Sequence, residues 1–237
     1  KDIAQRGCRV IVSCSPELAP LIKDCAGVSA VCQHMAGGGV YHDWQVAGMS
    51  AVVQLGYEYS DIDGRPYIGA YRPPPGLPKR RLKVGLCWRG NPRFEEEQYR
   101  LFDSALLFNA VKSVAADFVS LQRDEGEEAR PKWAARVPLD TWEHTARVIA
   151  GLDLVISSCT SVAHLSGAMG VPTWVIVPVM PYFIWALPGA TSPWYDSVRL
   201  FRQKKFGRWQ APFTAIKNAL TVLQNEKYKK LKNVKSI

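Results

Sequence analysis

Residues 152–178 combine two short apolar runs with a hydroxyl-rich turn and a helical pattern between them. The runs Leu154–Ile156 and Thr173–Val177 are typical of strands buried on both faces of a parallel sheet. Thr160 and Ser161 lie where a helix needs an N-cap. The pattern therefore predicts strand, turn, helix and strand, with the positive end of the helix facing outward from the sheet edge. Phosphate groups bind well at such a helix start.

His164 follows one helical turn after these hydroxyls. Its imidazole can point toward a ligand that Thr160 and Ser161 hold, and it could neutralise a phosphate there. In the alternative interpretation the two hydroxyls only cap a structural helix, and His164 packs beneath a loop.

The same alternation of apolar runs and helical segments continues along the chain. Strands are predicted at Leu82–Trp88, Asp117–Leu121, Leu152–Ser157, Thr173–Val177 and Val198–Leu200, and helices at Asp103–Ala115, Thr141–Gly151, Ser161–Met169 and Ala211–Gln224. This order predicts an α/β fold with a parallel sheet. Ligands bind such sheets at the carboxyl ends of the strands, where Trp88–Asn91, Gln122 and Thr160 would converge. The fingerprints of P-loop and dinucleotide-binding proteins are absent.

A smaller α/β unit is predicted before residue 73. Its strands are expected at Cys8–Cys14 and Ser29–Gln33, and its helices at Leu18–Cys25 and Val46–Leu55. The proline-rich segment 73–78 is stiff and extended, so it is the expected linker and hinge. We therefore divide the chain into a first domain (1–72), a basic linker (73–81), a second domain (82–226) and a basic tail (227–237).

The composition of the chain indicates where in the cell the protein is located. Hydrophobic residues make up 47% of the 237 positions, and no apolar run approaches the ~20 residues that span a bilayer. A cytoplasmic protein is expected. The cysteines, which are expected to be buried thiols, show no zinc-site spacing, and no metal site is predicted: Cys8, Cys14, Cys25, Cys32, Cys87 and Cys159.

The net charge of +9 indicates an acidic partner. Basic residues gather at 79–83, at 199–208 and in the tail. A nucleotide diphosphate, the anionic surface of the inner membrane and nucleic acid all fit this charge. Nucleic acid ranks last because no reader motif is present, and the plain alternative for the tail is a solvated, frayed end.

Five strings resemble bacterial glycosyltransferases of family 9, the heptosyltransferase-like group often fused to tetratricopeptide repeats, and more distantly the protein O-GlcNAc transferases. The strings are Lys83–Pro92, Asp117–Gln122, Leu152–Ser157 with Thr160–Leu165, Gly167–Trp174, and Ser192–Tyr195 with Arg199–Gln203. Their order and spacing cover roughly the last two thirds of the chain. The resemblance implies the GT-B architecture, in which two Rossmann-like domains flank a cleft. It also implies metal-independent inverting transfer of a hexosyl or heptosyl group from a nucleotide-diphosphate sugar, with no cofactor.

The resemblance also implies a set of donor contacts. Gly90 and Asn91 would lie near the sugar or diphosphate, and Thr160, Ser161 and His164 would hold the diphosphate. The other implied contacts are Arg100 to the phosphates, Gln122 to the base or ribose, Trp185 to the sugar, and Arg202 with Gln203 to the nucleotide. The plainer alternatives are an ordinary turn at 90–91, a surface ion pair of Arg100 with Glu95–Glu97, and a solvated strand end at Gln122. For Trp185, the alternative is packing in the core or at an interface.

Two departures from the family pattern argue against catalytic activity. Cys159 stands where many relatives have Asp, and Lys1–Gly7 starts after the family's opening strand and glycine-rich loop, so a short or truncated acceptor domain is expected. Both departures support a second hypothesis, a catalytically inactive nucleotide-sugar-binding or scaffold protein.

Inverting transfer needs a base to deprotonate the acceptor hydroxyl, whether of a glycan, a lipid-linked saccharide or a protein. The candidates in the first domain are His34, His42 and Asp43, and Asp43 is favoured because its surroundings resemble the family's Asp-containing stretch. The alternative for Asp43 is a surface loop.

Overall fold

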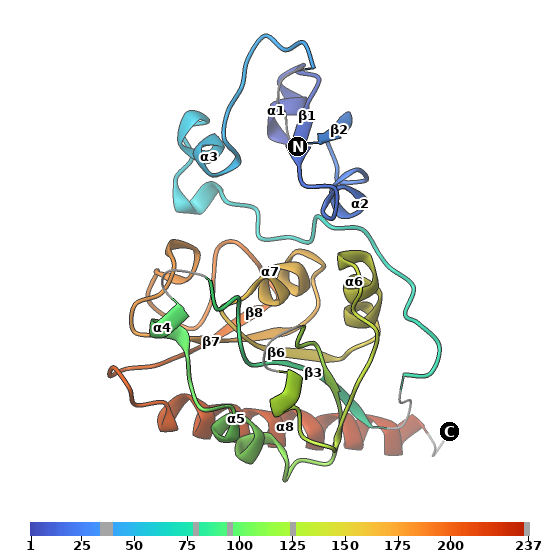
Figure 1. The fold of residues 1–237 in the computed structure, drawn as a ribbon, viewed down its shortest axis with the longest axis vertical. Helices are drawn as coiled ribbons and strands as arrows, with labels where there is room; N and C mark the ends of the chain where they lie inside the picture. The colour runs from blue at the N-terminus through green and yellow to red at the C-terminus, as the bar shows by residue number, and fades with distance from the viewer. Residues whose placement is uncertain (34–39, 78–80, 94–96, 124–126, 235–237) are drawn as a thin grey trace.

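The chain folds into two parallel β-sheets with helices packed around them (Figure 1). The computed structural model describes residues 1–33, 40–77, 81–93, 97–123 and 127–234. The first sheet has two strands and the second has six. The predicted α/β class with parallel sheets is confirmed.

The first unit is small and has short elements. Its strands β1 (Ile11–Cys14) and β2 (Ala30–Gln33) pair in parallel, and its helices are α1 (Asp2–Gln5), α2 (Ala19–Ile22) and α3 (Ala51–Gln54). The two predicted helices are thus shorter than expected, and a 3₁₀ turn at Gly48–Ser50 precedes α3. The physical reason is weak packing, because α3 buries no residue and α2 buries only Leu21.

The second sheet carries the predicted βαβ pattern. Its strands run in the order β5-β4-β3-β6-β7-β8, all parallel to their neighbours. Their bounds are β3 (Leu82–Cys87), β4 (Ala116–Ser120), β5 (Ala134–Ala135), β6 (Leu154–Ser158), β7 (Thr173–Val177) and β8 (Val198–Arg202). Only the edge strand β5 was not predicted, because two residues make no recognisable apolar run.

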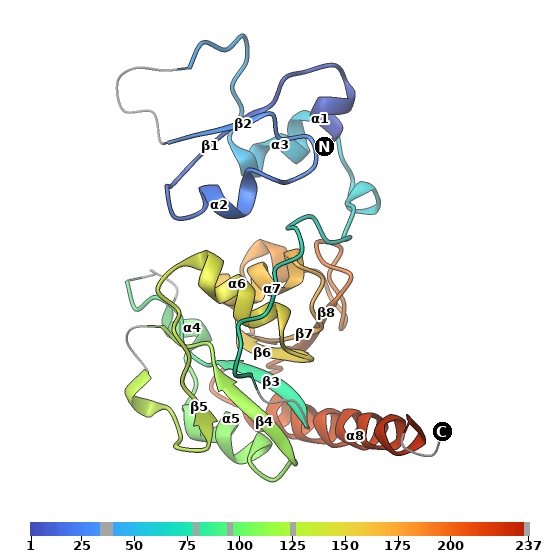
Figure 2. The ribbon, with the colours of Figure 1, turned by 90° about the vertical axis from the view of Figure 1, so that its right-hand side faces the viewer.

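Helices cover both faces of this sheet (Figures 1 and 2). On one face lie α5 (Ser104–Val111) and α8 (Gln210–Val234), and on the other lie α6 (Trp142–Ala150) and α7 (Ser161–Ala168). In β6, Leu154 and Ile156 pack in the core with α5 and α8, whereas Val155 packs with α6 and α7. Burial on both faces explains why the strands appear in the sequence as continuous apolar runs.

The last helix is longer than predicted. α8 continues past residue 224 to Val234, so residues 227–234 of the basic tail are helical instead of frayed. Lys227 forms an ion pair with Asp153, whose carboxylate also accepts the backbone N–H of Lys83 at 2.7 Å. No helix within the described ranges is both long and apolar enough to cross a membrane.

Residues 64–68 are fixed to the layer of α7. The carbonyl of Gly64 accepts the N–H of Asp196 at 2.8 Å, and the carbonyl of Ala168 accepts the N–H groups of Tyr67 and Ile68 at 2.9 and 3.1 Å. These contacts precede the proline-rich segment that was expected to be the linker and hinge. Pro78, Lys79 and Arg80 of that linker lie outside the described residues.

Candidate functional site

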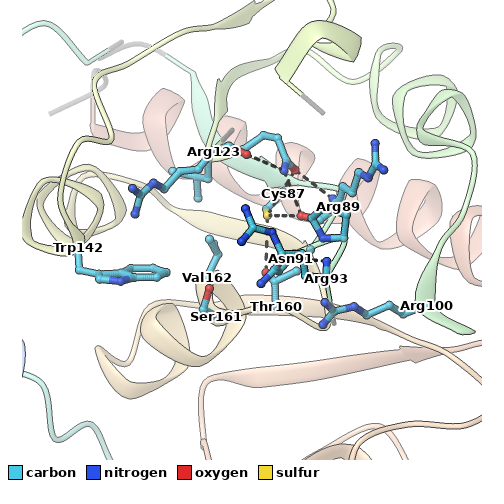
Figure 3. A pocket seen from close by; sticks show the side chains of 14 residues that line it. Cys87, Arg89, Asn91, Arg93, Arg100, Arg123, Trp142, Thr160, Ser161 and Val162 are labelled. Atoms are coloured by element: carbon cyan, nitrogen blue, oxygen red, sulfur yellow. Dashed lines mark hydrogen bonds between the residues drawn. The ribbon is translucent and has the colours of Figure 1, made fainter. Parts of the chain in front are cut away.

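A hollow of about 760 Å³ lies at the carboxyl ends of β3, β4 and β6, against the first turn of α7 (Figure 3). Its described lining includes four arginines and no Asp or Glu: Arg89, Arg93, Arg100 and Arg123. We call it the arginine pocket. The parallel topology also brings the predicted residues Gly90, Asn91, Gln122, Thr160 and Ser161 to this lining.

The side chain of Gln122 is hydrogen-bonded to the turn that follows β3. Its Oε1 accepts hydrogen bonds from the N–H groups of Trp88 (3.1 Å) and Arg89 (3.0 Å). Its Nε2 donates to the carbonyl groups of Arg89 (3.1 Å) and Arg123 (3.2 Å). The side chain is buried, with 5% of its surface exposed, so the solvated strand end is wrong. The amide holds the pocket wall together, and because Gln122 also lines the arginine pocket, its contact to a base or ribose stays a prediction.

Arg100 is held by a buried ion pair. In α4 (Glu97–Arg100), its guanidinium pairs with Glu97 and donates to the carbonyl of Cys159. Glu97 also accepts the N–H of Gly90 at 3.1 Å. The predicted alternative, a surface pair, is wrong in its location, because the two side chains are only 14% and 7% exposed. Glu95 and Glu96 lie outside the described residues.

Gly90 lies close to the side-chain ends of Arg100 and Glu97. A Cβ atom there would overlap the guanidinium of Arg100 and touch the carboxylate of Glu97. Asn91 is exposed, and its Oδ1 accepts the N–H of Arg93 at 2.9 Å, which is the bonding of an ordinary turn. Both residues line the arginine pocket, as the resemblance implies, but the N–H of Gly90 is already bonded within the protein.

The start of α7 is capped differently from the prediction. The helix begins at Ser161, but the hydroxyl of Thr160 makes no capping hydrogen bond. It lies 3.1 Å from Oγ of Ser157 and 3.6 Å from Sγ of Cys87, and Thr160 is buried. Ser161 is exposed. The positive end of the helix dipole therefore faces the pocket, and Ser161 offers the freer hydroxyl.

A second hollow of about 260 Å³ adjoins the first. Its wall is mainly aromatic and apolar, and we call it the aromatic pocket: His164, Pro178, Met180, Tyr182 and Trp185 line it. Arg100, Thr160 and Ser161 line both pockets. The two hollows therefore meet at the start of α7.

His164 and Trp185 form a stacked pair in the aromatic pocket. Their ring centroids are 5.0 Å apart with an interplanar angle of 27°. Nδ1 of His164 lies 3.0 Å from the hydroxyl of Tyr195. Burial, with a smaller effect of the Arg100 charge, lowers the pKa of His164 to about 4. At neutral pH the imidazole is therefore uncharged in the absence of a ligand, and its neutralisation of a phosphate stays a prediction.

Two cysteines belong to the pocket walls. Cys87 lines the arginine pocket and Cys159 the aromatic pocket. Burial raises the pKa of both thiols, to about 12 for Cys159, so neither is a thiolate. The thiol of Cys159 contacts the carbonyl of Ile176 at 3.3 Å and adds no charge where the family pattern has Asp. The prediction that all six cysteines are buried is wrong, since Cys8 is exposed and Cys14, Cys25 and Cys32 are half-buried.

Arg202 and Gln203 lie outside the linings of both pockets. The guanidinium of Arg202 donates to the carbonyl groups of Trp185 (2.7 Å), Gly189 (2.7 Å) and Leu187. Oε1 of Gln203 accepts the N–H of Val179 at 3.1 Å. Both side chains hold the 179–189 loop, and through it Trp185, while their contact to a nucleotide stays a prediction.

The two base candidates that the structure describes, His42 and Asp43, line neither hollow. Asp43 and His42 lie in an exposed stretch, where Nδ1 of His42 is hydrogen-bonded to the nearby carbonyl of Val40 at 2.8 Å. His34 lies outside the described residues. Asp43 therefore lies in a surface loop, as the alternative interpretation expected. No described residue before Cys87 lines either hollow.

Four site residues were missed, namely Arg93, Arg123, Trp142 and Tyr195, whereas Arg89 was expected at this edge within Trp88–Asn91 but was given no role. Arg89 and Arg123 directly flank predicted strand ends, so their position at the carboxyl edge was a usable signal. Within the described ranges, no group of three or more His, Cys, Asp and Glu side chains could hold a metal ion.

Comparisons with known proteins add a distant similarity. No family model matches the chain, and no solved structure matches it. The chain is 27% identical to the protein FlbA of Caulobacter vibrioides over 151 residues, which cover 58% of this chain and 25% of FlbA. The chain thus spans about a quarter of the length of this curated relative.

Proposed function

We propose that the protein is a metal-independent, inverting glycosyltransferase that moves a sugar from a nucleotide-diphosphate donor to a hydroxyl acceptor. The observation that carries this proposal is the arginine pocket, with four arginines and no carboxylate in its described lining, at the start of α7. Glu97 compensates Arg100, whereas no carboxylate among the described residues pairs with Arg89, Arg93 or Arg123. A diphosphate carries the matching negative charge.

Sugar transfer needs positive charge beside the departing diphosphate. As the bond from sugar to diphosphate breaks, negative charge builds up on the diphosphate. Arginine forks and the positive end of α7 can stabilise that charge without changing position. These groups would stabilise the transition state, in which the diphosphate carries more negative charge, more strongly than they stabilise the bound donor. This difference is the condition for catalysis.

The aromatic pocket suits the sugar. It is smaller than the arginine pocket, and its wall joins aromatic rings to a neutral imidazole. Sugars pack their C–H faces against aromatic rings and bond their hydroxyls to the polar atoms beside them. The bond to be broken would lie at Arg100, Thr160 and Ser161, which both pockets share.

By the same proposal, the chain belongs with GT-B enzymes of the family 9 type, acting on the cytoplasmic side of a membrane. The two-stranded first unit would be the reduced acceptor side. The acceptor would be a glycan, a lipid-linked saccharide or a protein hydroxyl, and the basic end of α8 could contact anionic lipid.

One observation favours the second candidate, a protein that binds the donor without transferring the sugar. No Asp or Glu is among the described residues that line either pocket. His164, the one imidazole in these linings, has a pKa of about 4 and is a weak base at neutral pH. In this case the base has to come from outside the described lining or be missing.

The test is nucleotide binding followed by turnover. Thermal shifts would be measured with UDP, GDP, ADP, CMP and their sugars, with and without magnesium, because a ligand of the folded state raises the melting temperature. Release of nucleoside diphosphate from the sugar that binds would then be followed with candidate acceptors. We expect a metal-independent shift for one diphosphate and release of that nucleotide.

Arg93→Gln and Lys112→Gln form a matched pair for this test. Both side chains are exposed and each change removes one positive charge, but only Arg93 lines the arginine pocket. Arg93→Gln should weaken binding by roughly tenfold, and Lys112→Gln should not. Binding without release would select the donor-binding candidate, and no shift with any nucleotide would overturn both.

A further inference from the structure

We infer that Trp142 and Arg123 form the subsite for the nucleobase, so the ligand of the arginine pocket is a nucleoside diphosphate and not a bare pyrophosphate or sugar phosphate. This inference rests on the proposed function and extends it to residues for which neither the motifs nor the resemblance gave a role.

The two pockets define a direction for the ligand. Arg100, Thr160 and Ser161 stand where the arginine pocket opens into the aromatic pocket. Trp142 lines the arginine pocket alone, and Figure 3 shows it on the side opposite Arg100. A donor with its sugar beyond Arg100 and its diphosphate at the start of α7 therefore extends its remaining part toward Trp142.

Trp142 is held as a platform. It is the first residue of α6, and the preceding Thr141 caps that helix by accepting the N–H of His144 at 3.0 Å. Its ring packs against the core formed with Leu21 and Val155, yet it remains part of the pocket wall. The ring is fixed by the core and borders the hollow beneath the guanidinium of Arg123, so a flat ligand at this end of the pocket would contact both planar groups.

Arg123 adds a second planar group at the same end. Its guanidinium carbon lies 5.6 Å from the centroid of the Trp142 ring. The carbonyl of Arg123 is held by Nε2 of Gln122, so the backbone of this arginine is anchored. Nucleobases stack on aromatic rings and on guanidinium planes, and the N–H groups of arginine bond to the acceptor atoms at a base edge.

The experiment separates the base from the phosphates. Calorimetry would measure binding of ADP, GDP, UDP and CDP, and of inorganic pyrophosphate, to the parent, Trp142→Ala, Trp142→Phe and Trp44→Ala. Trp44 is the matched control because it is 93% exposed and lines neither pocket. Far-ultraviolet circular dichroism checks that each variant is folded.

We expect Trp142→Ala to weaken the preferred nucleotide by roughly tenfold or more and to leave pyrophosphate unchanged. Trp142→Phe should keep most of the affinity, as should Trp44→Ala. If both ligands bind the parent and Trp142→Ala weakens them equally, or weakens neither, the base subsite is wrong while the diphosphate site stands. If neither pyrophosphate nor any nucleotide binds the parent, the proposed function itself fails.

Discussion

The hydroxyl of Tyr195 lies 3.0 Å from Nδ1 of His164, inside a cluster that Trp185 completes. The ring of Tyr195 packs closely on α7, because a Cβ at Gly167 would approach it to 2.7 Å. Burial, with a smaller contribution from Tyr67, raises the pKa of Tyr195. The phenol therefore stays protonated and fixes the orientation of the neutral imidazole at the wall of the aromatic pocket.

Tyr195→Phe should destabilise the protein by about 1 kcal/mol, because it leaves Nδ1 of His164 without its partner while keeping the ring. Urea unfolding followed by circular dichroism measures the change. Tyr41→Phe is the control, since Tyr41 is 88% exposed. Equal stability of parent and Tyr195→Phe would show that the hydroxyl does not hold the imidazole.

His164 should make the protein less stable as the pH falls from about 6.5 to about 4. The unfolded chain binds the proton near pH 6.5, whereas the folded protein resists it until the pKa of about 4. The penalty reaches roughly 3 kcal/mol at the lower end of this range. Free energies of unfolding of the parent and of His164→Phe, measured across these pH values, reveal it.

The slope with pH should be smaller in His164→Phe than in the parent, because carboxylates titrate in both proteins but this imidazole in only one. His144→Gln serves as the control, since the side chain of His144 is 50% exposed. Identical slopes in the parent and in His164→Phe would contradict a depressed pKa for His164.

Glu97→Gln should shift stability and anion binding in opposite directions. Removing one partner of a buried ion pair costs about 3 kcal/mol of stability. The freed charge of Arg100 should then bind pyrophosphate roughly tenfold more tightly, because a charge at about 4 Å is worth several kcal/mol near a protein surface. Urea unfolding and calorimetry measure the two effects.

Glu143→Gln is the matched control for this change. Glu143 also pairs with an arginine, Arg147 at 2.8 Å, but on the surface and away from both pockets. Its loss should change stability by no more than about 0.5 kcal/mol and should leave pyrophosphate binding alone. Weaker pyrophosphate binding in a folded Glu97→Gln protein would mean that Glu97 chiefly positions Arg100.

Gly90→Ala should push the Arg100 guanidinium away from its place, since the added methyl group overlaps it. We expect a loss of about 1–3 kcal/mol in stability and weaker binding of pyrophosphate. Gly69→Ala is the control, because a Cβ at position 69 meets nothing within 4 Å. Thermal melts and calorimetry on both variants decide the point, and matching behaviour of the two would exclude a packing role for Gly90.

The succession β6, α7 and β7 was predictable because each strand is buried on both faces and the helix between them starts at hydroxyl residues. The meeting of the 88–91 turn with Gln122 and Thr160 was predictable for a related reason. Parallel strands place their carboxyl ends at one edge, so residues far apart in sequence become neighbours there.

The bonding within the site was not predictable to the same degree. Gln122 bonds to backbone groups 33 and 34 residues away, and its residue type does not reveal such a partner. The same holds for Arg202, whose carbonyl partners depend on the path of the 185–189 loop. Asp43 was predicted to be the base only from the family resemblance. The pattern of apolar residues around it did not indicate that its side chain would be exposed.

The attachment of residues 64–68 to α7 decides where the chain can be cut. Ala168 receives two hydrogen bonds from this segment, and the ring of Pro66 covers Gly170, where φ is +73°. A fragment that starts in the proline-rich segment would leave the end of α7 bare and lose the 2.8 Å bond from Asp196 to Gly64. We therefore expect a fragment that carries both pockets to be more stable when it begins upstream of Gly64 than when it begins within the proline-rich segment.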